Sequence, residues 1–209
     1  MITAEQLKRL GINPALEPVF NETFEHWGIK TPRQQAAFIG QAGHECANFK
    51  VLEENLMYRA ETLLKLFPRT PKRAWGFTPE EAKAYERQPQ RIANRIYGNR
   101  MGNRDEKSGD GWRFRGSGWL QLTGHDNFYH AGKACGVDFV MNPDLVRTPK
   151  YAALTAGWFW ATHNCNELAE RGDNLSLTKK INGGTIGLDA RIHHTNLALA
   201  QFDPSVVLA

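Results

Sequence analysis

The sequence predicts a mainly α-helical protein, and three observations lead to this fold class. Helix-starting residues recur along the chain, a glycine pair ends one of the helical segments, and only one segment alternates with a period of two. With 209 residues, of which 41% are hydrophobic and 23% charged, the chain can bury a globular core. This length fits one domain that carries a small inserted subdomain.

The helix starts combine a capping residue with a glutamine or glutamate three positions later, or with a proline at the first helical position. The capping side chain accepts a hydrogen bond from a backbone N–H that has no partner inside the helix. In chain order these signals are Thr3 with Gln6, Asn13-Pro14, Thr31-Pro32 with Gln34, Thr78-Pro79 with Glu81, and Thr148-Pro149. A further helix begins near Leu177 and ends at Asn182-Gly183-Gly184.

The segment 109–123 is the exception, because large apolar residues alternate there with polar ones on both sides of Gly116-Ser117-Gly118. Such alternation is typical of extended chain, so we expect two short β-like segments around a glycine turn. The same alternation places Gln121 and Thr123 on one side of the second segment.

A change in composition predicts the inserted subdomain. Residues 60–103 are rich in arginine and proline, and helical patterns lie near 79–87 and 89–97. We therefore predict a main domain formed by residues 1–60 and 104–209, with a small helical subdomain inserted at residues 61–103.

The charge and hydropathy of the chain limit its partners. The net charge is +4 and the isoelectric point is near 9.0, which favours an anionic partner. The basic residues are scattered and form no nucleic-acid-binding motif, so we do not expect nucleic acid as a partner. The longest apolar run, residues 151–161, is too short to cross a bilayer, and the N-terminus lacks the pattern of a secretory signal. We expect synthesis in the cytoplasm and no membrane insertion.

The cysteines and histidines predict no metal site and no cofactor. Cys46, Cys135 and Cys165 are odd in number and widely spaced, which is unlike a disulfide framework or a CxxC metal motif. A catalytic cysteine paired with a histidine is the alternative to buried thiols. The pair His44-Glu45 is not a zinc motif, because HExxH would need a histidine where Asn48 stands.

Two carboxylates could act together if the chain turns between them. Glu45 follows an apolar helical stretch, and Glu54 lies nine residues later beside Glu53. One continuous helix would separate their backbones by about 13.5 Å and point the side chains to opposite sides. A break near Ala47-Asn48 would let Glu54 face Glu45 across a groove, as hydrolysis of a glycosidic bond by an acid and a base requires. Apolar neighbours of Glu45 would favour its protonated form.

Four ordered blocks of the sequence resemble the family 19 glycoside hydrolases, and in particular their phage and prophage endolysin branch. The resemblance covers roughly residues 31–60 and 105–195. The blocks are His44-Glu45, the run Glu53-Glu54-Asn55-Leu56 with Tyr58, the segment 109–124 followed by Asn127-Phe128, and Ile181-Asn182-Gly183-Gly184 with Arg191.

The resemblance implies a lysozyme-like fold with two lobes around a sugar groove, and an inverting mechanism that uses two glutamates. It implies Glu45 as general acid and Glu54 as general base, with Glu53 as the alternative base. Thr123 is then the hydroxyl that helps to position the attacking water. The residues that the resemblance implies or that we predict as substrate-binding are His44, Tyr58, Gln121, Asn127, Asn182 and Arg191, with Arg191 also tethering a catalytic carboxylate.

Departures from the family pattern favour peptidoglycan over chitin as substrate. A long insertion precedes Gly109, and the cysteines do not match the disulfides of plant chitinases. Ser117 and Phe128 replace a common arginine and a common tyrosine, so we expect the loss of one sugar or carboxylate contact. We therefore expect a monomeric endolysin that cuts between N-acetylmuramic acid and N-acetylglucosamine. It would be made in the host cytoplasm and reach the wall through a holin-type pore. The basic residues of 61–103 would help to hold anionic wall polymer.

Three other functions are the alternatives to this prediction. They are a chitinase on the same scaffold, a non-catalytic wall-binding module and a basic nucleic-acid-binding protein. The two glutamates argue against the second, and only the charge supports the third. For the tryptophans we expect packing in the core more often than stacking on sugars; these are Trp112, Trp119, Trp158 and Trp160.

Overall fold

The computed structural model describes residues 1–203 and 205, and about 60% of the chain is helical with almost no strands, which confirms the mainly α prediction. No helix in this part of the chain is long and apolar enough to cross a membrane. The α-helices are α1 (Ala4–Arg9), α2 (Glu17–His26), α3 (Pro32–Glu45), α4 (Ala60–Leu66), α5 (Pro79–Tyr85), α6 (Pro89–Tyr97), α7 (Asp110–Arg113), α8 (His125–Cys135), α9 (Pro149–Thr162), α10 (Cys165–Glu170), α11 (Asn174–Asn182) and α12 (Leu188–Phe202). Short 3-10 turns are η1 (Pro14–Leu16), η2 (Glu106–Ser108) and η3 (Pro143–Arg147).

The predicted capping boxes are present at three helix starts. Thr3, Thr31 and Thr78 each accept a hydrogen bond from the backbone N–H three residues on, and that residue's side chain bonds back to the capping residue. The other two starts differ in detail. Asn13 caps only the 3-10 turn η1, and the side chain of Thr148 does not cap α9.

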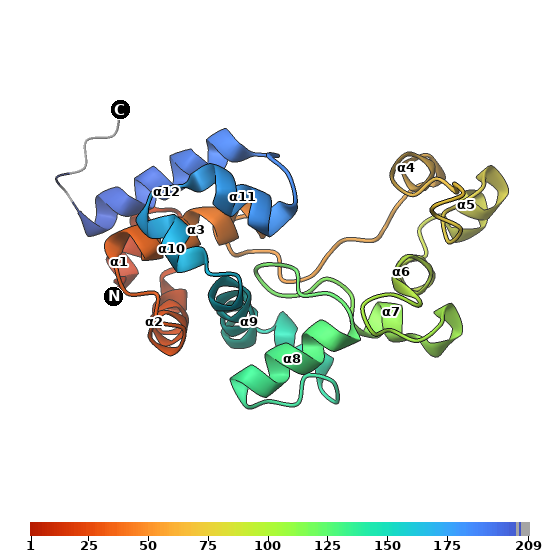
Figure 1. The fold of residues 1–209 in the computed structure, drawn as a ribbon, viewed down its shortest axis with the longest axis horizontal. Coiled ribbons are helices and arrows are strands. Elements are labelled where there is room, and N and C mark those ends of the chain that lie inside the picture. The colour runs from red at the N-terminus through yellow and green to blue at the C-terminus, as the bar shows by residue number, and fades with distance from the viewer. Residues whose placement is uncertain (204, 206–209) are drawn as a thin grey trace.

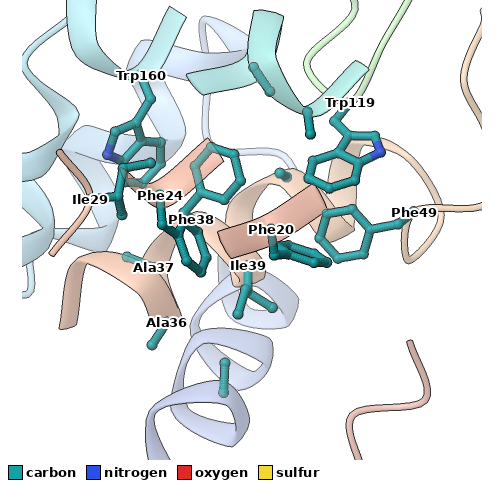
Figure 2. Packing of buried hydrophobic residues seen from close by; sticks show 14 of the residues in the cluster. Phe20, Phe24, Ile29, Ala36, Ala37, Phe38, Ile39, Phe49, Trp119 and Trp160 are labelled. Atoms are coloured by element: carbon teal, nitrogen blue, oxygen red, sulfur yellow. The ribbon is translucent and has the colours of Figure 1, made fainter. Parts of the chain in front are cut away.

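The largest core packs around α3. Its aromatic centre, shown in Figure 2, brings together Phe20 of α2, Phe38 of α3, Phe49 of the loop after α3 and Trp160 of α9, with Trp119 from the loop between α7 and α8. Helix α12 can lie directly against α3 because Gly40 has no side chain. A Cβ at this position would stand 2.7 Å from the backbone nitrogen of Thr195. Trp119 and Trp160 are both fully buried in this core, as predicted for them.

A second, smaller core belongs to the segment between residues 56 and 97. Its buried members are Leu56, Leu63, Phe77, Ala82, Tyr85, Ile92, Ala93 and Ile96. Helices α4, α5 and α6 form this group, and they lie apart from α1–α3 and α10–α12 in Figure 1, joined to α3 by an extended stretch of chain. We call this group the small lobe. The exact division into domains stays a prediction.

The structure corrects the prediction of two extended segments in 109–123. Residues Asp110–Arg113 form the short helix α7, and the extended character of the described segment is limited to isolated antiparallel bridges of Ser117 with Leu122 and with Glu53. The alternation of Trp112 and Phe114 does not come from an extended backbone. It arises because Trp112 packs on the small lobe and Phe114 packs on a third cluster around α8. The backbone N–H of Trp112 also bonds to the Asn94 side chain, 2.7 Å away, which favours the helical turn.

Candidate active site

Helix α3 ends at Glu45 because the chain reverses immediately after it. Ala47, Asn48 and Phe49 have φ angles of 49°, 56° and 65°, a left-handed conformation that no helix continues. This turn confirms the predicted break near Asn48. The Asn48 side chain donates to the carbonyl oxygen of Gly11 at 2.9 Å, and the ring of Phe49 packs on Trp119 at 4.6 Å between centroids. Glu45 is thereby the last helical residue, with its side chain at the protein surface.

A buried arginine from α12 holds the Glu45 side chain. The Arg191 side chain is 2% exposed, and its Nη2 donates to Oε1 of Glu45, whose side chain is 22% exposed. The same guanidinium donates to Oε1 of Gln41 at 3.0 Å and to the carbonyl oxygen of Ile186 at 3.2 Å. Among the described residues nothing bonds to the second carboxyl oxygen of Glu45, so that oxygen can meet a substrate.

Glu54 lies in a different environment, on the extended stretch between α3 and α4. Its Oε2 accepts a hydrogen bond from the Tyr97 hydroxyl at 2.7 Å, and its Oε1 accepts one from the backbone N–H of Gly116 at 2.6 Å. Burial raises the pKa of this carboxyl above its usual value, against the lowering effect of these hydrogen bonds. Glu54 is therefore a half-buried carboxyl group held by two fixed donors.

The neighbouring Glu53 faces the other way. Its side chain is 51% exposed and forms ion pairs with Arg115 at 2.5 Å and with Arg147 at 3.6 Å. A half-exposed carboxylate with two arginine partners is typical of a surface ion-pair network. The surroundings favour Glu54 over Glu53 as the second catalytic carboxyl, and that assignment stays a prediction.

We expect Glu54→Gln to stabilise the folded protein at neutral pH. A raised pKa means that the folded protein binds the Glu54 proton more tightly than the unfolded chain does. The wild type therefore loses stability as the pH rises above the unfolded value of about 4.5, through the folded pKa, whereas the amide does not titrate. Thermal melting between pH 4 and pH 8 should show a melting temperature that is higher for the variant at pH 8, with the difference vanishing near pH 4. A difference that does not change with pH would contradict this.

Three of the predicted sugar-binding and water-positioning residues line one pocket of about 300 Å³. Gln121, Thr123 and Asn127 share this pocket with the half-buried aromatic side chains of Trp158, Phe159 and His163 from α9 and its end. The Thr123 hydroxyl donates to the carbonyl oxygen of Gln121 at 2.8 Å, and Asn127 donates to the carbonyl oxygen of Thr123 at 2.8 Å. The acceptor oxygens of Thr123 and Asn127 remain available to a ligand. A larger apolar hollow of about 490 Å³ beside α8 holds none of the predicted site residues.

Gly116 is the point at which this pocket and Glu54 converge. A Cβ on Gly116 would stand 2.7 Å from Oε1 of Gln121 and 3.1 Å from Oε1 of Glu54. Both side chains thus approach the same patch of backbone, which only glycine leaves open.

Gly116→Ala should therefore lower activity by about 100-fold, because small displacements of reacting groups have effects of this size. Both Glu54 and Gln121 would have to move away from the added methyl group. Turnover of a soluble glycan fragment and the melting temperature would be measured together. Unchanged turnover would contradict the convergence, and a large fall in melting temperature would mean that the loss reflects unfolding.

Asn182 and His44, two further predicted residues, contact the loop between α11 and α12. Asn182 accepts a hydrogen bond from the backbone N–H of Gly184 at 2.8 Å and donates to the carbonyl oxygen of Ile186 at 3.0 Å, so its amide shapes the loop that Arg191 also holds. The His44 ring lies against Gly187, where a Cβ would overlap it. Burial and the charge of Arg191 lower the pKa of His44. This histidine is therefore mostly neutral near pH 7.

Tyr58 packs on the small lobe. Its ring lies 6.1 Å from that of Phe67, and burial, with the charge of Glu54, raises the pKa of its hydroxyl.

Sequence reasoning missed Tyr97 and the aromatic wall of the pocket. Tyr97 contacts Glu54 across 43 positions of chain, and no local pattern predicts such a contact. The stacked pair of Phe159 and His163, 3.9 Å between centroids, is visible on α9 as neighbours four residues apart, but the pattern does not say that it faces Gln121. The cysteine alternative finds no support, since burial raises the pKa of Cys46 to about 12 and keeps the thiol protonated.

Comparison with known proteins decides the family. A protein from Haemophilus influenzae described as a glycosyl hydrolase family 19 domain-containing protein is 43% identical over 171 residues, which is 80% of this chain and 79% of that protein. The chain belongs to glycoside hydrolase family 19. The family model described as class I chitinase matches residues 74–171, a range that holds Gln121, Thr123 and Asn127 but not Glu45 or Glu54.

This family 19 protein is also similar to plant enzymes over a shorter part. An acidic 27 kDa endochitinase from Solanum lycopersicum is 46% identical over 71 residues, 34% of this chain and 25% of that protein. The fold is similar to that of chitinase C from Streptomyces griseus, with a TM-score of 0.61 at 16% identity, over 100% of this chain and 78% of that one. Family membership and fold agree with a chitinase-like glycoside hydrolase, and the protein is an enzyme of that class.

Proposed function

We propose that this family 19 enzyme is an endolysin that hydrolyses the β-1,4 bond between N-acetylmuramic acid and N-acetylglucosamine in peptidoglycan. The observation that carries the proposal is the pair of glutamates with unlike surroundings: Glu45 is paired with an arginine at the end of α3, and Glu54 is half-buried beside Gly116. Two carboxyls in unlike environments are what an acid and a base need.

Each group has a role in the proposed reaction. Glu45 gives a proton to the leaving oxygen through the carboxyl oxygen that Arg191 leaves free. Glu54 takes a proton from a water that attacks the anomeric carbon from the opposite face, so the configuration inverts. The Thr123 hydroxyl donates to the Gln121 carbonyl, which turns its lone pairs toward the pocket and lets it accept a hydrogen bond from that water. Gln121 and Asn127 offer amide groups to the N-acetyl substituents.

Peptidoglycan is the proposed substrate because the chain departs from plant chitinases in its insertion before Gly109 and in its cysteines. The chain also carries a positive net charge of +4, which suits a polymer with peptide carboxylates. A monomer made in the host cytoplasm, which reaches the wall through a holin-type pore, completes the proposal.

The basic small lobe is proposed to help retain anionic wall polymer, through those of its cations that stay free. Arg69 and Arg95 form ion pairs with Glu81 at 2.7 and 3.0 Å. Three other cations of the lobe are exposed: Lys72, Lys83 and Arg87. Reversal of these three exposed charges should weaken sedimentation with purified sacculi at low salt. Unchanged sedimentation would remove the small lobe from wall binding.

The substrate is tested by comparing kcat/KM on purified sacculi with kcat/KM on N-acetylglucosamine hexamers. The proposal expects the enzyme to release glycan from sacculi and to cut the hexamer at least about tenfold less efficiently, the discrimination that one extra contact of about 1.4 kcal/mol provides. Preference for the hexamer would favour the chitinase alternative. Absence of cleavage of both would contradict the proposed substrate.

A further inference from the structure

Tyr97 is the one small-lobe side chain that, in the described part of the chain, hydrogen-bonds to a candidate catalytic carboxyl. It is the last residue of α6, and its hydroxyl donates to Oε2 of Glu54 at 2.7 Å. Burial and the neighbouring Glu54 charge raise the pKa of the phenol, so Tyr97 keeps its proton and stays a donor over the working range of pH. A charge-assisted bond of this length is among the stronger hydrogen bonds in proteins.

The Tyr97 bond acts on Glu54 against the effect of burial. Burial disfavours the carboxylate, while the Tyr97 hydroxyl and the Gly116 N–H favour it. The other charged or titratable groups near Glu54 are Arg115 and Arg147, which also favour the carboxylate, and the Tyr58 hydroxyl. Tyr97 and Gly116 each hold a different oxygen, so together they fix the rotation of the carboxyl.

The backbone of Tyr97 is tied to the sugar pocket by one buried side chain. Asn103 is 6% exposed; its Nδ2 donates to the carbonyl oxygen of Tyr97 at 3.0 Å, and its Oδ1 accepts from the backbone N–H of His125 at 2.9 Å. His125 is the first residue of α8, two positions before Asn127. The end of α6, which carries the Glu54 donor, and the start of α8, which carries a pocket residue, are therefore held at a fixed separation.

We propose that Tyr97 is a positioning residue for Glu54, by which the small lobe orients the catalytic base and keeps it ionised. The proposal rests on the proposed role of Glu54 as base. It assigns the segment 61–103 a part in catalysis in addition to any part in wall binding, since the lobe supplies a donor that the main body lacks at Oε2.

The test is Tyr97→Phe, which removes one oxygen and keeps the ring. Loss of the donor should raise the pKa of Glu54, so the acidic limb of the kcat/KM profile, where the base becomes protonated, should move upward by about one pH unit. Activity should fall most at low pH and recover in part at high pH, and the loss should appear in kcat more than in KM. If Tyr97 had only a packing role, the variant would have lower kcat/KM at every pH, and the acidic limb would stay at the same pH.

Tyr85→Phe is the matched control. Tyr85 is buried in the same small lobe and also donates to a glutamate, Glu106, at 2.5 Å. Its variant should lose similar stability in thermal melting and leave the acidic limb in place. A limb that moves equally in both variants, or in neither, would overturn the proposal.

A titration that needs no substrate separates this proposal from the proposed function. The carboxyl carbon of Glu54, followed by NMR in ¹³C-labelled protein, should titrate about one pH unit higher in Tyr97→Phe than in wild type or Tyr85→Phe. If that shift occurs while wild type cuts no glycan, the proposed function fails and the positioning contact stands. If the enzyme cuts glycan and Glu54 titrates alike in all three proteins, the positioning role is wrong.

Discussion

Glu45→Gln should lower kcat/KM on peptidoglycan by about 1,000-fold, because a glutamine cannot donate the proton that the leaving sugar oxygen needs. The fold should survive, since the glutamine side-chain oxygen can still accept the hydrogen bond from Arg191 that Glu45 accepts in wild type. The turbidity of sacculi suspensions and the release of reducing ends would measure the loss.

The loss should depend on the leaving group. An aryl glycoside with an acidic phenol departs without protonation, so Glu45→Ala should retain far more activity on a dinitrophenyl chitooligosaccharide than on the natural polymer. Activity of Glu45→Gln on sacculi within tenfold of wild type would rule out Glu45 as the acid.

Glu54→Ala should also lose about 1,000-fold on the natural substrate, for the opposite reason: nothing then takes the proton from the attacking water. The truncated side chain leaves a space beside Gly116, with the donors of Gly116 and Tyr97 still pointing into it. Azide is a nucleophile that needs no base, and this space should admit it. Sodium azide should therefore restore turnover of the activated substrate and yield an α-glycosyl azide, with inverted configuration.

The two variants together decide which carboxyl has which role. In the unliganded protein, the ion pair of Glu45 with Arg191 and the raised pKa of Glu54 would also suit the opposite assignment, with Glu45 as base and Glu54 as acid. The family resemblance assigns Glu45 as acid and Glu54 as base. Azide rescue of Glu45→Ala, with none of Glu54→Ala, would mean that the roles are exchanged.

Local signals predicted the helices well, because their causes are local. Thr31 and Gln34 are three residues apart and cap α3 by reciprocal bonds that any chain with these residues can form. The turn at Asn48 was predicted for the same reason. Alternation misled where neighbours in sequence pack on separate clusters: Trp112 and Phe114 lie two residues apart in a helical turn, on the small lobe and on the α8 cluster.

The candidate site was predictable mainly in its charged, amide and hydroxyl residues. A carboxylate, an amide or a buried arginine has few uses, so the resemblance could point to Glu45, Gln121 and Arg191. Tyr97 has many possible uses in an amphipathic helix, and its contact with Glu54 depends on how the small lobe sits on the main body. The aromatic wall of Trp158 and Phe159 likewise depends on the packing of α9 beside the loop that carries Gln121.

The most direct test of the central claim is mass spectrometry of peptidoglycan digested by wild type and by Glu45→Gln, after borohydride reduction of the new ends. The account predicts reduced N-acetylmuramic acid ends with wild type and none above background with the variant. Free peptides or cut cross-bridges on intact glycan strands would contradict it, since they would mean that the enzyme attacks an amide bond in place of a glycosidic bond.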